Sequence, residues 1–330
     1  MYPVFDKSKP GDVVAFGRAT IDLYANELGP MEDAITFSKY VGGSPANTSV
    51  AMANLGLKVG YIGKVSDDQF GRYIIRYLGL KGIDTSHIEY AEPGIRSGVT
   101  MGEIKSPTEC SFFMYRTDCA DLHISCSQLD EEYIASFKML LVSGTSLTHS
   151  PAREAVFLAL DMAKRNNVRT VLDLDYREGT WNSPEEASIY YNLAAEKADL
   201  VLGTREEFDV MEYLYLPGNR SDEVSAKRLL DKGCSLVSIK KGRQGSTVYL
   251  GDSTVSGGIY PAKVLKTFGA GDAYSGAMMY SLINGFPMEK ALSYAAAASS
   301  ITISGHSCSD STPTLEQVEQ YVAEHEIVYS

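Results

Sequence analysis

The sequence predicts an α/β fold, and three observations support this class. Short apolar runs of the kind that form buried strands recur along the chain, as in 12–17 and 169–173. Segments with apolar residues at helical spacing lie between them, as in 69–78. The length of 330 residues exceeds that of most single domains, but α/β folds reach this size around one core. Because strands alternate with helices, we expect βαβ units.

The first elements place polar residues directly after a predicted strand. The apolar run 12–17 ends in glycine, and Asp22 follows just past it. Ligands in open α/β sheets gather outside the carboxyl ends of strands, so Asp22 could bind hydroxyl groups, although a solvated turn aspartate fits equally well. Gly42 and Gly43 then precede a predicted helix that carries Asn47 near its start. This diglycine could let a ligand approach the backbone beside the Asn47 amide; the alternative is a plain turn and cap.

The pattern changes between 94 and 120, where short alternating pieces replace the longer apolar runs. The pieces are 98–101 and 110–115. Pro107 separates them, and together with 28–40 they predict a small β appendage. Arg116 ends the second piece, where its guanidinium could clamp a carboxylate or lie on the surface.

The alternation of strands and helices continues through the rest of the chain. Strands are predicted at 59–63, 138–143, 169–173 and 199–203, a hairpin at 236–250, and helices at 288–303 and 314–324. The segment Asp173-Leu174-Asp175-Tyr176-Arg177 again places polar residues at a strand exit. Thr204 and Glu207 follow the strand at 199–203 and predict either a helix cap with its first turn or a carboxylate for a metal.

The turn Gly269-Ala270-Gly271-Asp272 begins a predicted helix that runs from about Ala270 to Asn284. The first N–H groups of a helix have no internal partner, and these small residues leave room for an anion beside them. Asp272 lies next to that site, where we expect nearby N–H groups to favour its ionised form and where it could accept a proton from an alcohol. An anion cradle beside a base suits phosphoryl transfer; the alternative is a glycine turn with an acidic residue that complements the helix dipole.

Composition argues against several classes of function. The net charge of −12 argues against a nucleic-acid or anionic-membrane partner, and no stretch reaches membrane-spanning length. The five cysteines form no CxxC pair and fit reduced packing residues, while the five histidines show no metal-ligand spacing. The N-terminus has no apolar signal core, so we expect a soluble, cytoplasmic protein.

The order of these motifs resembles the ribokinase-like (PfkB) sugar kinases over almost the whole chain. The resemblance implies one domain spanning 1–330, with a doubly wound, mostly parallel sheet covered by helices on both faces and a small β-sheet lid from about 18–40 and 94–120. It implies phosphorylation of a sugar hydroxyl from ATP with Mg²⁺, with Asp272 as the base beside an anion hole. Glu207 would act on the metal through water, although Thr204 stands where the family has asparagine.

Each part of the site is then implied by particular residues. The anion hole would comprise Gly269, Ala270 and Gly271; the sugar site Asp22, Gly42, Gly43, Asn47, Arg116 and Arg177; and the nucleotide site Thr204, Lys240, Gly242, Gly245 and Gly305. The segments 173–181, 203–208 and 265–269 look like the branch that phosphorylates a keto-deoxy sugar acid in myo-inositol breakdown. Fructokinases and 2-keto-3-deoxygluconate kinases are the alternatives within the family, and an inactive sugar-sensing protein is the alternative outside it. The implied partners are a small sugar acid and ATP, with a homodimer through the lid also compatible.

Four positively charged residues have open roles at this stage. An acid substrate needs a local cation in a chain of net charge −12, and Arg116, Arg177 and Arg96 are candidates. Lys266 stands where many members of the family have the aspartate of a DTxGAGD string, a region that helps hold a monovalent cation in those kinases. Its ammonium could take the place of the cation or point into solvent.

Overall fold

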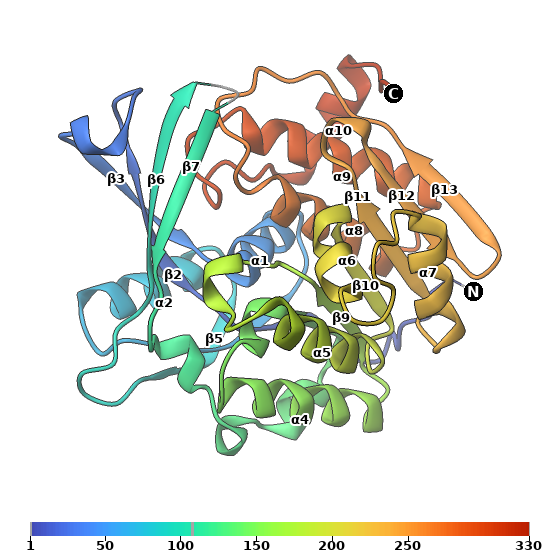
Figure 1. Cartoon of the computed structure of the whole chain (residues 1–330), viewed down its shortest axis with the longest axis horizontal. Helices are drawn as coiled ribbons and strands as arrows, with labels where there is room; N and C mark the ends of the chain where they lie inside the picture. Colours follow the sequence, from blue (N-terminus) through green and yellow to red (C-terminus); the bar gives the residue numbers. More distant parts are fainter. Residues whose placement is uncertain (1, 107–108, 330) are drawn as a thin grey trace.

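The computed structural model describes residues 2–106 and 109–329, which form two sheets with helices around the larger one (Figure 1). The larger sheet has nine strands. From one edge to the other they are β13 (Ser253–Gly257), β12 (Ser246–Leu250), β11 (Leu236–Lys240), β10 (Leu200–Thr204), β9 (Arg169–Asp173), β8 (Phe137–Ser143), β1 (Gly11–Phe16), β4 (Val59–Val65) and β5 (Asp84–Tyr90). All pairings from β11 to β5 are parallel, while β12 and β13 add an antiparallel edge.

Each central strand supplies side chains to two cores, because successive residues of a strand point to opposite faces. In β1, Val13 and Ala15 belong to one hydrophobic cluster, whereas Val14 and Phe16 belong to the other. All four are fully buried. This continuous apolar run is therefore the signature of a strand covered on both faces, as the sequence predicts.

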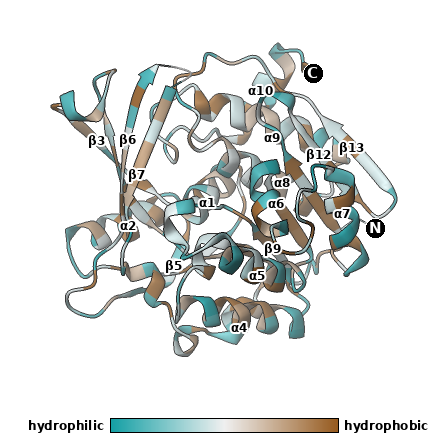
Figure 2. Cartoon of the chain, viewed as in Figure 1, coloured by the Kyte–Doolittle hydropathy of each residue, from teal (hydrophilic) through white to brown (hydrophobic). Residues whose placement is uncertain are grey.

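Helices cover both faces of the large sheet. The first face packs against α1 (Ser44–Asn54), α2 (Gln69–Leu80), α8 (Ala270–Ile283), α9 (Met288–Ile303) and α10 (Leu315–Glu324). The second packs against α3 (Glu131–Ala135), α4 (Ala152–Arg165), α5 (Pro184–Ala195), α6 (Arg205–Glu212) and α7 (Asp222–Asp231). Figure 2 shows the hydrophobic strands inside and hydrophilic surfaces on outer helices such as α7. The predicted doubly wound α/β fold is confirmed, and no helix in the described part of the chain is long and apolar enough to cross a membrane.

The smaller sheet has four strands in the order β3-β2-β6-β7 and stands beside the main body (Figure 1). Its strands are β2 (Thr20–Ala25), β3 (Phe37–Gly42), β6 (Val99–Ser106) and β7 (Glu109–Tyr115). β2 pairs antiparallel with β3 and parallel with β6, and β6 pairs antiparallel with β7. These strands fall within or close to the segments expected to form the lid; Pro107 lies outside the described residues.

The structure corrects one local prediction and adds two strands. Asp22 does not follow the end of the first strand, because it lies inside β2 of the smaller sheet, after the chain has turned at Gly17. The added strands, β5 and β13, are the two edges of the large sheet. Both have mostly exposed or half-buried side chains, so they lack the apolar run by which a buried strand is recognised.

Candidate active site

The N-terminus of α8 is open, as the glycine turn predicts. Gly269 caps the helix in the left-handed region at φ 81°, and a Cβ there would lie 3.0 Å from the Cys308 side chain. In the part of the chain that the structure describes, no side chain caps the first N–H groups of the helix. A Cβ on Gly271 would meet only Nζ of Lys240, at 3.4 Å, so an ammonium group lies directly beside the turn. Free N–H groups and an ammonium at one helix end form a site for an anion such as phosphate.

Asp272 lies in the first turn of α8, and two α1 side chains hold its carboxylate. The Ser44 hydroxyl donates to Oδ1 at 2.7 Å, and Nδ2 of Asn47 donates to Oδ2 at 2.9 Å. Burial, reinforced by the negative charge of Asp175, raises the pKa of Asp272 to about 6 despite these two bonds. The expectation that N–H groups favour its ionised form is wrong for this reason. A carboxylate with a pKa near neutral is suited to accept a proton.

Asp22 lies across the cavity and is packed against the backbone of β3. A Cβ on Gly42 would lie 1.9 Å from Oδ1 of Asp22, so only glycine leaves room for this carboxylate. The Tyr24 hydroxyl donates to Oδ2 of Asp22 at 2.7 Å. Burial raises the pKa of Asp22, an effect that the Tyr24 hydrogen bond opposes. Gly42 therefore contributes space for a polar side chain that faces Asp272.

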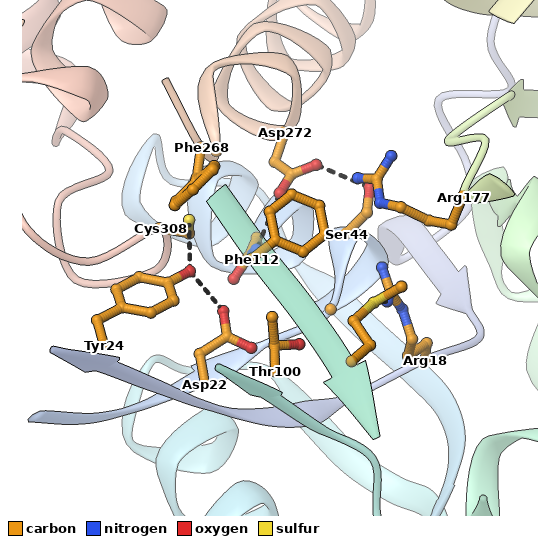
Figure 3. A pocket seen from close by; sticks show the side chains of 14 residues that line it. Arg18, Asp22, Tyr24, Ser44, Thr100, Phe112, Arg177, Phe268, Asp272 and Cys308 are labelled. Atoms are coloured by element: carbon orange, nitrogen blue, oxygen red, sulfur yellow. Dashed lines mark hydrogen bonds between the residues drawn. The ribbon is translucent and has the colours of Figure 1, made fainter. Parts of the chain in front are cut away.

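Between these groups lies a small cavity of about 80 Å³. Its lining residues are Arg18, Asp22, Tyr24, Gly43, Ser44, Asn47, Thr100, Phe112, Met114, Arg177, Phe268, Gly269, Asp272 and Cys308. Figure 3 shows Asp272 on one side, Asp22 with Tyr24 on another, and Arg18 and Arg177 together on a third. Phe112, Met114 and Arg177 also line a neighbouring cavity of about 630 Å³. β7 extends over the site, since Phe112 packs edge-on against Phe268 with ring centroids 5.2 Å apart.

The three predicted arginines are in different environments. Arg177 lines the cavity, and its Nη2 lies 2.6 Å from Oδ1 of Asp175. Arg116 lines only the neighbouring cavity, where its buried guanidinium is paired with Asp121 at 2.5 Å. Arg96 is exposed and lines neither. Of the three, only Arg177 is brought to Asp272.

The residues expected at the nucleotide lie outside both cavities: Thr204, Lys240, Gly242 and Gly245 are around the ends of β10 and β11, and Gly305 follows α9. Lys240 ends β11, pairs with Thr204 in register and places Nζ 3.3 Å from Oδ1 of Asp173. Burial alone would lower the pKa of Lys240, but Asp173 and Glu207 raise it above its ordinary value, so the ammonium stays charged. The local backbone geometry explains why glycine occupies three of these positions. Gly242 and Gly245 adopt positive φ in the turn after β11, and a Cβ on Gly305 would lie 2.2 Å from the Ser311 hydroxyl.

Glu207 completes a capping box at the start of α6. Its Oε2 accepts a hydrogen bond from the Thr204 backbone N–H at 2.8 Å, while the Thr204 hydroxyl accepts one from the Glu207 N–H at 3.3 Å. Oε1 accepts from the N–H of Tyr176 at 3.0 Å. Burial raises the pKa of Glu207, and Lys240 opposes this. The helix cap is therefore real; a role toward a metal stays a prediction.

Magnesium fits this region as an ion bound with a nucleotide. The described residues include no group of three histidine, cysteine or acidic side chains arranged to hold a metal. Mg²⁺ at nucleotide sites keeps several waters and takes only one or two carboxylates besides phosphate oxygens. Glu207 is the predicted carboxylate, and the neighbouring Asp173 has the same chemistry.

Sequence reasoning missed several cavity residues. The important ones are Arg18, Ser44, Tyr24, Thr100, Phe112 and Met114, together with Cys308, which was expected only to pack. The sequence contains a signal for Ser44 as a site residue, because it lies between the diglycine and Asn47 at the start of the same helix. Arg18 had a weaker one, since it follows the glycine that ends the first predicted strand.

Comparison with known proteins identifies the class. The pfkB family of carbohydrate kinases matches residues 11–315, and the chain belongs to this family. It is 54% identical over 323 residues to 5-dehydro-2-deoxygluconokinase of Geobacillus kaustophilus, covering 97% of this chain and 96% of the relative. The protein of the same name from Bacillus subtilis is 49% identical over 323 residues, with 96% and 98% covered.

The fold is also that of solved structures in this class. Fructokinase from Xylella fastidiosa, solved with bound ATP, has a TM-score of 0.85 at 22% identity, covering 95% of this chain and 98% of that one. A structure from Escherichia coli that contains ATP and Mg²⁺ has a TM-score of 0.86 at 23% identity, with 96% and 100% covered. At these identities the likeness concerns the fold.

Proposed function

We propose that this carbohydrate kinase transfers the γ-phosphoryl group of ATP to the terminal primary hydroxyl of 5-dehydro-2-deoxy-D-gluconate, as a step of myo-inositol catabolism. One observation carries the proposal: Asp272, with a pKa near 6, lines a cavity at the open N-terminus of α8, where Lys240 also lies. The substrate name comes from the relatives at 54% and 49% identity, each matched over nearly its whole length.

The chain's own groups divide the chemistry between them. The Asp272 carboxylate accepts the proton of the attacking hydroxyl as the new oxygen–phosphorus bond forms and the bond from phosphorus to the bridging oxygen of ADP breaks. The N–H groups at Gly269, Ala270 and Gly271, together with the Lys240 ammonium, stabilise the negative charge on the transferred group. Mg²⁺, when bound with ATP, neutralises phosphate charge, with Glu207 as its proposed contact through water.

The sugar is held from the smaller sheet and α1. Asp22 and Asn47 are proposed to hydrogen-bond its hydroxyl groups; Oδ1 of Asn47 is buried and has no hydrogen-bond partner among the described residues. Gly43 and Arg177 line the same cavity, so a sugar chain there lies against backbone and beside a guanidinium. Arg116 is a weaker candidate for direct contact because it does not line this cavity: Asp121 and the Thr145 carbonyl occupy its Nη2, while its Nε and Nη1 have no hydrogen-bond partner among the described residues.

A substrate panel tests the proposal directly. ADP release is measured with 5-dehydro-2-deoxygluconate, 2-keto-3-deoxygluconate, fructose, ribose and adenosine, and the phosphorylated position is assigned by mass spectrometry and ³¹P NMR. We expect the first compound to have the highest kcat/KM. Higher efficiency on fructose or 2-keto-3-deoxygluconate would instead assign the chain to that activity, and binding without any ADP release would identify a sugar sensor.

Two further properties belong to the same proposal. We propose a homodimer formed through the smaller sheet, because Phe37, Phe113 and Tyr115 are exposed on it. Sedimentation velocity of the native chain and of a Tyr115→Lys variant tests this: the native chain should sediment as a dimer and the variant as a monomer. A cytoplasmic location is supported by the five cysteines, all of which are free.

A further inference from the structure

Arg18 is a buried cation whose hydrogen-bonding capacity is largely unused. It follows β1, is 3% exposed and lines the cavity that contains Asp272. Its Nε has no hydrogen-bond partner among the described residues. Nη1 reaches only the sulfur of Met114, at 3.1 Å, and Nη2 lies 3.5 Å from Oδ2 of Asp175. A guanidinium has five N–H donors, so a buried one with contacts this weak is under-satisfied.

Among the described residues, the one carboxylate that Arg18 contacts is that of Asp175, and it has better partners. Arg177 approaches Oδ1 of Asp175 at 2.6 Å, and the Ser143 hydroxyl donates to Oδ2 at 2.9 Å. The Arg18 contact, at 3.5 Å, is the longest of these and shares Oδ2 with Ser143. Asp175 therefore pairs chiefly with Arg177, and Arg18 has only a long contact with it that it shares with Ser143.

The neighbouring charges agree with this. Asp175, Arg116, Arg177 and Asp121 act on Arg18, and Arg18 in turn acts on the carboxylate of Asp22 without a hydrogen bond to it. Since Arg116 pairs with Asp121 and Arg177 with Asp175, Arg18 has no ion pair among the described residues closer than its 3.5 Å contact with Asp175. The two other acids of the cavity are Asp22 and Asp272, which accept hydrogen bonds from uncharged groups. The guanidinium of Arg18 is thus left without a close carboxylate partner where the cavity is lined by both Arg18 and Arg177 (Figure 3).

We propose that Arg18 binds the carboxylate of the substrate and is the residue that selects a sugar acid over a neutral sugar. This rests on the proposed function and deepens it. A carboxylate that enters beside Arg18 supplies the missing acceptor for its free donors and a negative charge within close reach of the guanidinium. A neutral sugar leaves these donors without a charged acceptor, so the discrimination comes from the penalty on the wrong substrate as well as from attraction to the right one.

The test compares an acid with a neutral analogue. Native enzyme, Arg18→Gln and Arg18→Lys are assayed with 5-dehydro-2-deoxygluconate, with 2-keto-3-deoxygluconate and with the analogue of the first in which a primary alcohol replaces the carboxylate. Arg96→Gln is the matched control, since Arg96 is exposed and outside both cavities. Asp175 keeps Arg177 in the Arg18 variants, so circular dichroism and thermal melting should report a folded protein.

We expect Arg18→Gln to lower kcat/KM for the acid by roughly 10²- to 10³-fold, mainly through KM, with little change for the neutral analogue and for ATP. Arg18→Lys keeps a charge without the planar fork and should fall in between. Equal losses on acid and neutral analogue, or acid selectivity that persists in Arg18→Gln, would overturn the assignment while the proposed substrate stands.

The outcomes also separate this proposal from the proposed function. A native enzyme that prefers 2-keto-3-deoxygluconate, and loses its preference for acids in Arg18→Gln, would overturn the proposed substrate and keep Arg18 as the carboxylate site. A native enzyme that uses the neutral analogue as well as the acid would overturn the Arg18 proposal, whichever sugar proves to be the natural one.

Discussion

Two buried cations near Asp272 differ in how the protein satisfies them. Lys266, before the glycine turn, is fully buried, and its ammonium donates to the carbonyl of Phe268 at 2.7 Å and approaches that of Thr302 at 3.5 Å. Arg18, on the side of the smaller sheet, lines the cavity with its Nε unpartnered. The first cation is held by the chain's own carbonyls, whereas the second lacks such an acceptor.

This difference separates a structural charge from a ligand-binding one. Burial lowers the pKa of Lys266, but Cys308 and Asp272 act in the opposite direction. Its carbonyl partners belong to the turn before Gly269 and to the end of α9, so the ammonium ties the anion-hole turn to a neighbouring helix. Carbonyl oxygens are also the ligands that a monovalent cation would use, which supports the idea that Lys266 is a built-in substitute for one. That idea stays a prediction.

The largest effect is expected at Asp272, because both cations lie near this residue. Asp272→Asn keeps the shape, and an amide can still accept from Asn47 and donate to the Ser44 hydroxyl, but it cannot take up a proton. We expect kcat to fall by roughly two to four powers of ten, with ATP affinity by calorimetry largely kept. Asp252→Asn, an exposed acid, is the control. Near-native turnover in Asp272→Asn would falsify the assignment of the base.

Substitutions of Lys266 test whether its buried ammonium takes the place of a monovalent cation. Activity of the native chain should change little when potassium is replaced by tetramethylammonium at fixed ionic strength, because the positive charge is already built in. Lys266→Met removes charge-assisted hydrogen bonds worth roughly 1.5–3 kcal/mol, so activity should fall about 10- to 100-fold. Lys266→Asp should also lose activity and gain a dependence on potassium.

The matched control is Lys263→Met, since Lys263 is exposed on the same loop. Melting temperatures separate a loss of folding from a loss of activity. If the native enzyme were strongly activated by potassium, a cation site would exist beside the lysine and the substitution idea would be wrong.

A pH profile tests the raised pKa. Because Asp272 acts as a base only when ionised and its pKa is raised to about 6, kcat/KM should be flat above that pH and fall below it. The loss should approach tenfold for each unit of pH well below the pKa, with a slope of one. A solvated carboxylate, with a pKa of about 3.9, would hold nearly full activity down to about pH 5. A profile still flat at pH 5 would mean that burial does not raise the pKa of Asp272.

Local patterns could predict the parts of the molecule that depend on neighbours in sequence. The helix after Gly269 follows from a glycine turn and helical spacing, and the fully buried β1 follows from its apolar run. Asp22 lines the cavity, but the sequence analysis places it after the wrong strand, because its position depends on a sheet formed with residues about 80 positions away, near Thr100. The position of Arg18 after a strand-ending glycine is a weak signal in the sequence, but its missing partners become visible only when β7 and Asp175 are brought beside it.

The smallest effect is expected at Glu207. Like the ammonium of Lys266, its carboxylate is held by backbone groups, since each of its oxygens accepts a hydrogen bond from a backbone N–H. Thr204→Ala and Thr314→Ala each remove the hydroxyl of a capping box, at α6 and α10, so each should lower the free energy of unfolding by about 1 kcal/mol in urea titrations. If Glu207 also serves the metal, only Thr204→Ala should raise the Mg²⁺ concentration needed for half-maximal rate, by a few-fold, because the cap orients that carboxylate. Equal magnesium dependence in the two variants would leave Glu207 with a structural role alone. Glu207 would then resemble Lys266, a charged group that the chain's own backbone holds in place.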